Sequence, residues 1–277
     1  MITVLVLLAG GVAAGIFGSL LGLGGGVLIV PLLTLGFGLP LRESVSVSLV
    51  SVIVTSSAGA SIYLQKHVAN LRLGMVLELF SAAGALVGGL IAFMLSEQAL
   101  AALFAVLLLW VSISMLRRRE PAKPSPDAAS TATAPAGAAP SATTFTDTLG
   151  GPGYRVHSLP KGMAGSAFAG LISALLGVGG GIIKVPTMHL LMGVPLRVAT
   201  ATSNMMIGIT ATSSAVIYLL RGQIDPFVAG PTAIGVFVGA TIGSRISSRV
   251  DVRLLRVLFV AVLLYTAFEM AQRALAL

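Results

Sequence analysis

A glycine-rich stretch that ends in a proline occurs twice in this chain, 155 positions apart. The first copy, GLGGGVLIVP, runs from Gly22 to Pro31, and the second, GVGGGIIKVP, runs from Gly177 to Pro186. Over the 21 positions that begin at each first glycine, 11 residues are identical. The chain is therefore an internal duplication, and its fold must contain two similar halves, each with a glycine break near its start.

The composition places both halves in a membrane. Hydrophobic residues make up 56% of the chain, charged residues 9%, and the mean hydropathy is +1.00. A soluble domain has about a quarter of its residues charged, so a lipid bilayer is the expected solvent. The apolar run from Ile2 has no basic residue before it, which favours a membrane helix over a cleaved signal peptide.

The net charge of +8 raises the possibility of a nucleic-acid partner, but the basic residues lie between apolar segments. An excess of Lys and Arg on the cytoplasmic side of a membrane protein explains that placement, so we expect no nucleic-acid partner. The chain has no cysteine, which excludes a disulfide framework and a thiolate metal site.

Apolar segments predict an all-α polytopic membrane protein with four to five helical segments in each half. The expected segments are 2–21, 27–38, 44–64, 73–94 and 98–116 in half one, and 161–176, 182–193, 199–220, 227–247 and 254–275 in half two. A straight span needs about 20 residues. The third, fourth and fifth segments of each half meet this length, whereas the second segments, with 12 residues each, do not.

A short apolar segment beside a glycine run indicates a helix that is broken inside the membrane. Non-helical backbone at that depth is tolerated only where protein or a watery cavity surrounds it. The first two segments of each half are therefore predicted to form a hairpin whose glycine tip lies in the bundle. The alternative is a tight turn at the membrane face, where glycine merely permits a positive φ.

The two halves are joined by a segment rich in Pro, Ala, Ser and Thr. We expect residues 1–118 to form membrane repeat one, 119–160 a flexible cytoplasmic linker, and 161–277 membrane repeat two. A cytoplasmic linker places 13 of the 17 Lys and Arg residues inside. The halves then enter the membrane in opposite senses with both termini outside, which is an inverted-topology repeat of the kind found in secondary transporters.

The sequence contains no convincing catalytic constellation. The three histidines are scattered, no carboxylate pair lies within one apolar segment, and no Gly-Lys-Ser/Thr follows the glycines as a nucleotide-binding loop requires. We therefore expect neither an enzyme nor a cofactor or metal site.

The glycine breaks instead indicate anion binding. Glycines that lead into a helix expose backbone N–H groups at the positive end of the helix dipole. The residues concerned are Gly24, Gly25 and Gly26 in half one and Gly179, Gly180 and Gly181 in half two. Lys184 lies three residues farther on, inside an apolar segment, and is a candidate ligand because a lysine there is expensive. The alternative is that its side chain reaches a lipid headgroup.

Hydroxyl and amide side chains at the start of the third segments could add neutral donors. Ser48 and Ser203 occupy equivalent positions, and Asn204 is present in half two only. These hydroxyls could instead bond to their own helix backbone.

Charged residues near the segment ends each have two interpretations. Arg42 and Arg197, which are equivalent, either attract anions at the two entrances or anchor helix ends. Glu78 and Glu269 are either proton-coupling carboxylates or interfacial glutamates.

The chain resembles the TauE/SafE family of sulfite and organosulfonate exporters. The resemblance rests on the duplicated Gly-x-Gly-Gly-Gly with its following proline, and on the stretch from Val194 to Ser203, VPLRVATATS, which is similar to that family's second block. Half one departs from this block, with Ser46-Val47-Ser48 where half two has Ala201-Thr202-Ser203. The resemblance implies a multi-pass inner-membrane transporter that moves small sulfur-containing anions, usually outward.

We therefore expect a secondary transporter of sulfite or sulfonates, most simply an exporter, that works by alternating access around a central anion site. Its partners would be a small anionic substrate and the lipid bilayer, and the sequence leaves room for a homodimer. The alternatives are an importer or an exporter of another small anion, a membrane-embedded enzyme, and a subunit of a larger protein complex.

Overall fold

The computed structural model describes residues 2–21, 26–65, 68–117, 149–151, 154–246 and 252–276. Half one contains α1 (Ile2–Leu21), α2 (Gly26–Pro31), η1 (Leu32–Gly36), α3 (Leu41–Gln65), α4 (Leu71–Met94) and α5 (Glu97–Arg117). Half two contains α7 (Leu159–Leu176), α8 (Gly181–Pro186), η3 (Thr187–Leu191), α9 (Leu196–Leu220), α10 (Pro226–Ile246) and α11 (Val252–Ala276). Within the described ranges there is no strand, only an isolated bridge between Gly151 and Tyr154, so the predicted all-α fold is confirmed.

Six of the described helices are long and apolar enough to cross a membrane. They cover Leu41–Ala60, Leu71–Met94, Glu97–Leu116, Leu159–Leu176, Leu196–Leu220 and Pro226–Gly243. Five of them are predicted third, fourth or fifth segments. The sixth, α7, extends the predicted 161–176 segment by two residues at its start. The protein is therefore a multi-pass membrane protein.

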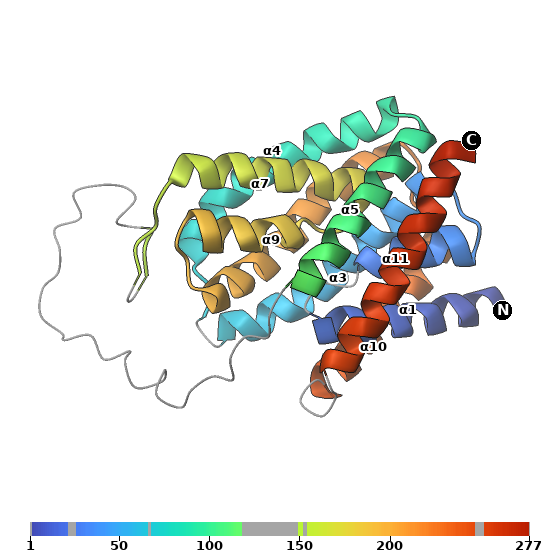
Figure 1. Ribbon diagram of the computed structural model, residues 1–277, viewed down its shortest axis with the longest axis horizontal. Helices are drawn as coiled ribbons and strands as arrows, with labels where there is room; N and C mark the ends of the chain where they lie inside the picture. Colours follow the sequence, from blue (N-terminus) through green and yellow to red (C-terminus); the bar gives the residue numbers. More distant parts are fainter. Residues whose placement is uncertain are drawn as a thin grey trace, which may run out of the picture.

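The duplication is visible in the arrangement of the helices. Five pairs of elements begin at equivalent positions, 155 residues apart: α2 and α8, η1 and η3, α3 and α9, α4 and α10, and α5 and α11. The main helix contacts join one half to the other. The first helix of each half packs against the other half, α1 against α10 and α7 against α4, while α3 pairs with α9 and α5 with α11. In Figure 1, α1 begins at the N-terminus on the right and α7 begins on the left, so these equivalent helices run in opposite directions.

Glycines bring the exchanged helices into backbone contact. A Cβ atom on Gly170 of α7 would lie 1.9 Å from the carbonyl oxygen of Ser81, and one on Gly84 of α4 would lie 2.0 Å from that of Ala167. The α1–α10 interface is built in the same way around Gly235, Gly239 and Gly243. In lipid, helices associate through such close packing rather than through the hydrophobic effect, so these glycines of α4 and α10 serve the helix interfaces.

The end of the predicted linker packs onto the bundle. Leu149 and Val156 are buried in a cluster with Leu73 at the start of α4. Asn70 caps α4 by accepting from the N–H of Leu73 (3.0 Å), and its amide donates to the carbonyl oxygen of Leu149 (2.8 Å). Residues 119–148, 152 and 153 of that segment lie outside the described residues, and the boundaries of the linker stay a prediction.

Candidate functional site at the glycine tips

The glycine tip of half two is buried between α3 and α9. Gly177, Gly179 and Gly180 have φ angles of 69°, 80° and 72°. A residue other than glycine adopts such angles only with strain. A Cβ atom on Gly179 would also lie 2.8 Å from Ile207 of α9 and 3.0 Å from Val52 of α3. Glycine is thus needed here both for the backbone path and for the close approach of the two helices.

The two glycine tips meet at Ser48. The hydroxyl of Ser48 donates to the carbonyl oxygen of Gly177 (2.7 Å) and lies 3.2 Å from that of Gly26. A Cβ atom on Gly26 would lie 2.7 Å from the same Gly177 oxygen. Ser48 therefore joins the tip of one half to that of the other. Gly24 and Gly25 lie outside the described residues.

Ser203, at the position equivalent to Ser48, differs from it in its hydrogen bonding. Its side chain is 1% exposed, and among the described residues its hydroxyl has no hydrogen-bond partner. It lies 3.5 Å from the position of a Cβ atom on Gly181, the first residue of α8. A buried hydroxyl without a partner loses hydration without compensation, which makes Ser203 a candidate ligand-binding residue.

Two further serines are buried in the same way, without a partner for the hydroxyl in the described structure. Among the described residues, the hydroxyls of Ser166 and Ser173 also have no hydrogen-bond partner. Both belong to α7, which flanks α8 on one side as α9 does on the other. Ser173 lies at the tip, with its Cβ atom 3.4 Å from the position of a Cβ atom on Gly180. Two of the three hydroxyls, those of Ser203 and Ser173, therefore border the glycine tip of half two.

Lys184 lies in a buried polar network that joins the two halves. Its side chain is fully buried, and its Nζ atom lies 3.1 Å from Oε2 of Glu78. The ammonium also donates to the hydroxyl of Thr210, which in turn donates to Oε1 of Glu78 (2.6 Å) and lies 3.0 Å from the hydroxyl of Ser81. A lysine that reached a lipid headgroup and a glutamate at an interface would both be exposed, so those two alternatives are wrong.

The remaining candidates lie away from the tips. Arg42 donates through Nε to the carbonyl oxygen of Ala92 (3.3 Å) and through a terminal nitrogen to that of Leu95, so in this structure its guanidinium anchors the end of α4. Arg197 is exposed at the start of α9. Asn204 is half-buried and faces Gly59 of α3.

The comparisons with known proteins agree with the geometry of a transporter. The family model described as "Sulfite exporter TauE/SafE" matches residues 7–270. The chain belongs to the TauE/SafE family. It is therefore a membrane transporter and not an enzyme.

Named relatives of this TauE/SafE protein come from bacteria and plants. The chain is 27% identical over 236 residues to the "Probable membrane transporter protein YunE" of Bacillus subtilis (strain 168), which covers 83% of each chain. It is 37% identical over 76 residues to the "Sulfite exporter TauE/SafE family protein 6" of Arabidopsis thaliana, over 27% of this chain and 18% of the relative. No solved structure matches the chain significantly.

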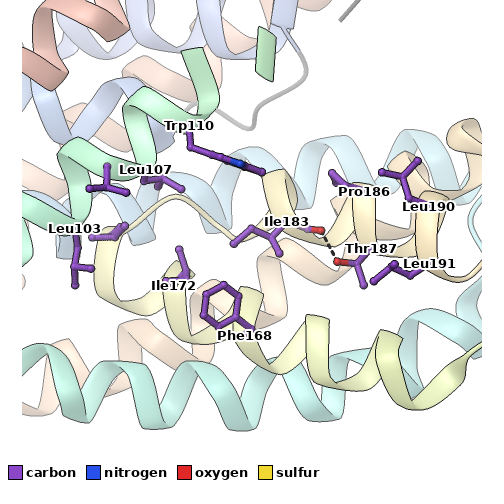
Figure 2. A pocket seen from close by; sticks show the side chains of 12 residues that line it. Leu103, Leu107, Trp110, Phe168, Ile172, Ile183, Pro186, Thr187, Leu190 and Leu191 are labelled. Atoms are coloured by element: carbon purple, nitrogen blue, oxygen red, sulfur yellow. Dashed lines mark hydrogen bonds between the residues drawn. The ribbon is translucent and has the colours of Figure 1, made fainter. Parts of the chain in front are cut away.

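An apolar groove lies beside the broken helix of this TauE/SafE transporter. It has a volume of about 650 Å³ and lies between α5, α7 and the α8–η3 segment. Figure 2 shows Trp110, Phe168 and Leu190 among its lining side chains, and the hydroxyl of Thr187 is bonded to the carbonyl oxygen of Ile183 (2.8 Å). A groove of this chemistry does not suit a small anion, so the candidate anion site stays at the tips.

Proposed function

We propose that this protein exports small sulfur-containing anions, such as sulfite or sulfonates, across the inner (plasma) membrane. The observation that carries the proposal is the buried hydroxyl of Ser203, which has no hydrogen-bond partner among the described residues and lies beside Gly181, the first residue of α8. The name of the family and that of its Arabidopsis relative support sulfite as the substrate.

The tip offers an oxyanion several neutral donors at once. Ser203 of α9 and Ser173 of α7 both border the glycine run of half two, and both hydroxyls are free of protein partners among the described residues. Backbone N–H groups of the glycine run would add to them. These groups bind the oxygens of an anion through hydrogen bonds and add no charge of their own.

Alternating access would follow from the duplicated architecture. We propose that the halves have inverted topology and that a hairpin of one half moves against the rest of the bundle while the site stays near the middle. The opposite directions of α1 and α7 and the exchange of α1 and α7 between the halves support this arrangement. For an anion that moves without a coupling ion, an inside-negative potential favours export by about 2.3 kcal/mol per charge per 100 mV.

The test of the site is the substitution Ser203→Ala in the purified protein. If Ser203 binds the anion, the affinity for sulfite falls roughly tenfold or more, since a hydrogen bond to a charged group is worth about 1.5–3 kcal/mol. The thermal stability without sulfite should stay equal or rise, because an unsatisfied buried hydroxyl is removed. The measurement is the sulfite dissociation constant together with the melting temperature.

Ser214→Ala is the matched control on the same helix. Its hydroxyl is also buried, but it donates to the carbonyl oxygen of Thr210 (3.1 Å), so its loss should leave sulfite affinity unchanged. Equal affinities of Ser203→Ala and the wild type would remove the tip from the proposed site.

The proposed topology predicts that Ser96, just after α4, is outside and Arg245, in the last turn of α10, is inside, although α4 and α10 are equivalent helices. The chain has no cysteine of its own, so single cysteines at the two positions can be labelled with an impermeant reagent in intact cells. Only the cysteine at position 96 should react. Equal labelling at both positions would contradict the inverted repeat.

A further inference from the structure

The buried ion pair is present at only one of two equivalent places in the fold. The positions equivalent to Lys184, Glu78 and Ser81, counted 155 residues along the chain, are Ile29, Ala233 and Val236. All three are buried, and Ile29 and Val236 belong to one apolar cluster. The same arrangement of helices thus packs without charges at the equivalent site, so the fold does not require the pair.

A charged pair that the fold does not require is expensive inside a membrane protein. Both partners lose their hydration, and their mutual attraction often fails to compensate for that loss. Ionisable side chains at such positions commonly serve transport of ions or protons. The polar network of Lys184, Glu78 and Thr210 is therefore a candidate for function rather than for stability.

We propose that Glu78 is the binding site of a coupling proton, and that one proton on Glu78 accompanies each monovalent anion that binds with the help of the Lys184 ammonium. Without the anion, the ionised carboxylate of Glu78 neutralises the ammonium. When the Lys184 ammonium leaves Glu78 and pairs with the anion, the carboxylate would be left unpaired inside the membrane unless it binds a proton. With the proton bound, the site stays neutral, with one ammonium, one anion and one carboxylic acid.

The surroundings of Glu78 contain the groups that this exchange needs. Among the described residues, Lys184 is the charged side chain that contacts Glu78, and it comes from α8. From the helices packed on α4, the hydroxyl of Thr210 comes from α9, and Gly170 of α7 lies against the backbone of Ser81. A protonated Glu78 can donate to the Thr210 oxygen, which stops receiving the ammonium proton when Lys184 leaves.

The ammonium has a short path from Glu78 to the glycine tip. Ser203 and Thr210 lie seven residues apart on the buried face of α9, which corresponds to about 10 Å along the helix. In this structure the ammonium is at the Thr210 end, so one small oxyanion at Ser203 does not reach it. Lys184 begins only three residues after Gly181, and its long, flexible side chain can turn from Glu78 toward the tip once the carboxylate is neutral.

This inference rests on the anion site of the proposed function but not on the proposed direction. Since the coupled cycle moves no net charge for a monovalent anion, the membrane potential would not drive it. The sum of the anion and proton gradients would decide its direction. An inward proton gradient would drive uptake, and a steep outward anion gradient would drive export.

The test uses the full-length purified protein and methanesulfonate, which stays a monoanion at all pH values of interest, whereas sulfite itself titrates. Proton-linked binding predicts that the dissociation constant rises about tenfold per pH unit where Glu78 is ionised in the free protein. In liposomes held at zero membrane potential, an inward proton gradient should drive methanesulfonate accumulation.

Two variants isolate the proton site. Glu78→Gln mimics the protonated carboxylic acid, so it should bind methanesulfonate at all pH values with the low-pH affinity of the wild type. Glu269→Gln removes a different carboxylate, which is half-buried on the apolar helix α11, and should keep the wild-type pH dependence. If Glu78→Gln does not fold, proton uptake on binding to the wild type decides, measured calorimetrically in buffers with different heats of ionisation.

The outcomes separate the two proposals. Methanesulfonate binding that is independent of pH, with no proton uptake, overturns the proton site and leaves the anion site standing. If neither methanesulfonate nor sulfite binds at any pH, the proposed function is overturned, and this inference with it.

Discussion

Glu78→Ala is expected to lower the free energy of unfolding by about 3–5 kcal/mol, because it leaves the Lys184 ammonium buried without its counter-ion. The ammonium is fully buried and lies 3.1 Å from the Glu78 carboxylate. Of its two side-chain partners in the described structure, only the hydroxyl of Thr210 would remain. The measurement is denaturant-induced unfolding of the purified protein in detergent micelles.

Adding Lys184→Ile to Glu78→Ala should recover most of that loss. The double variant carries the residues of the equivalent site, where Ile29 and Ala233 are both buried. Replacing a buried ion pair by apolar residues is often neutral or stabilising. Lys161→Ile, at an exposed lysine of α7, is the control for loss of a lysine and should change stability by no more than about 0.5 kcal/mol.

The double variant also separates stability from transport. If the pair serves function, the double variant should fold but no longer couple anion binding to a proton. A double variant as unstable as Glu78→Ala alone would show that the pair is needed for folding, contrary to the argument from the equivalent site.

The helices and the duplication could be predicted from local sequence. Apolar runs indicate each span. The constant offset of 155 residues predicts that equivalent helices begin 155 residues apart, as α3 and α9 do at Leu41 and Leu196. The short second segments were also predicted. In the structure they correspond to α2 with η1 and to α8 with η3. These features depend on composition and glycine placement, which a single sequence contains.

The partners of the buried charges could not be predicted in the same way. Glu78 and Lys184 are 106 residues apart and belong to different halves. They meet because α4 packs on α7 of the other half, and no local periodicity encodes that exchange. The only signal was that each is a lone charge of opposite sign within an apolar segment, which indicated two separate hypotheses rather than one pair.

Equivalent residues in the two halves also do not take equivalent roles. Ser48 bonds to backbone carbonyls at the meeting of the tips, whereas Ser203 has no partner among the described residues. The sequence offers the same residue at both positions. Whether the serine hydroxyl bonds to backbone carbonyls or has no partner among the described residues depends on the side chains around each tip, and these differ between the halves.

The second large effect is expected at the interface of α1 and α10, from Gly239→Ala. A Cβ atom at this position would lie 2.1 Å from the carbonyl oxygen of Val12 and 2.8 Å from its Cα atom. Both neighbours are backbone, so no side-chain rotation relieves the clash, and the two helices must move apart. Because helices in lipid rely on this close packing, we expect a loss of at least about 1–3 kcal/mol, seen as a large fall in melting temperature or in the yield of monodisperse protein.

Gly230→Ala on the same helix is the matched control, because a Cβ atom there meets nothing within 4 Å. Alanine has a higher helix propensity than glycine by about 0.8–1.0 kcal/mol, so propensity alone predicts that both variants are more stable than the wild type. Only the contact with α1 distinguishes them. A Gly239→Ala protein as stable as Gly230→Ala would mean that α1 does not pack on α10 in the membrane as it does in this structure. Gly84→Ala, whose Cβ atom would lie 2.0 Å from the carbonyl oxygen of Ala167, should repeat the loss at the equivalent α4–α7 interface, since the duplication builds both interfaces from the same backbone contact.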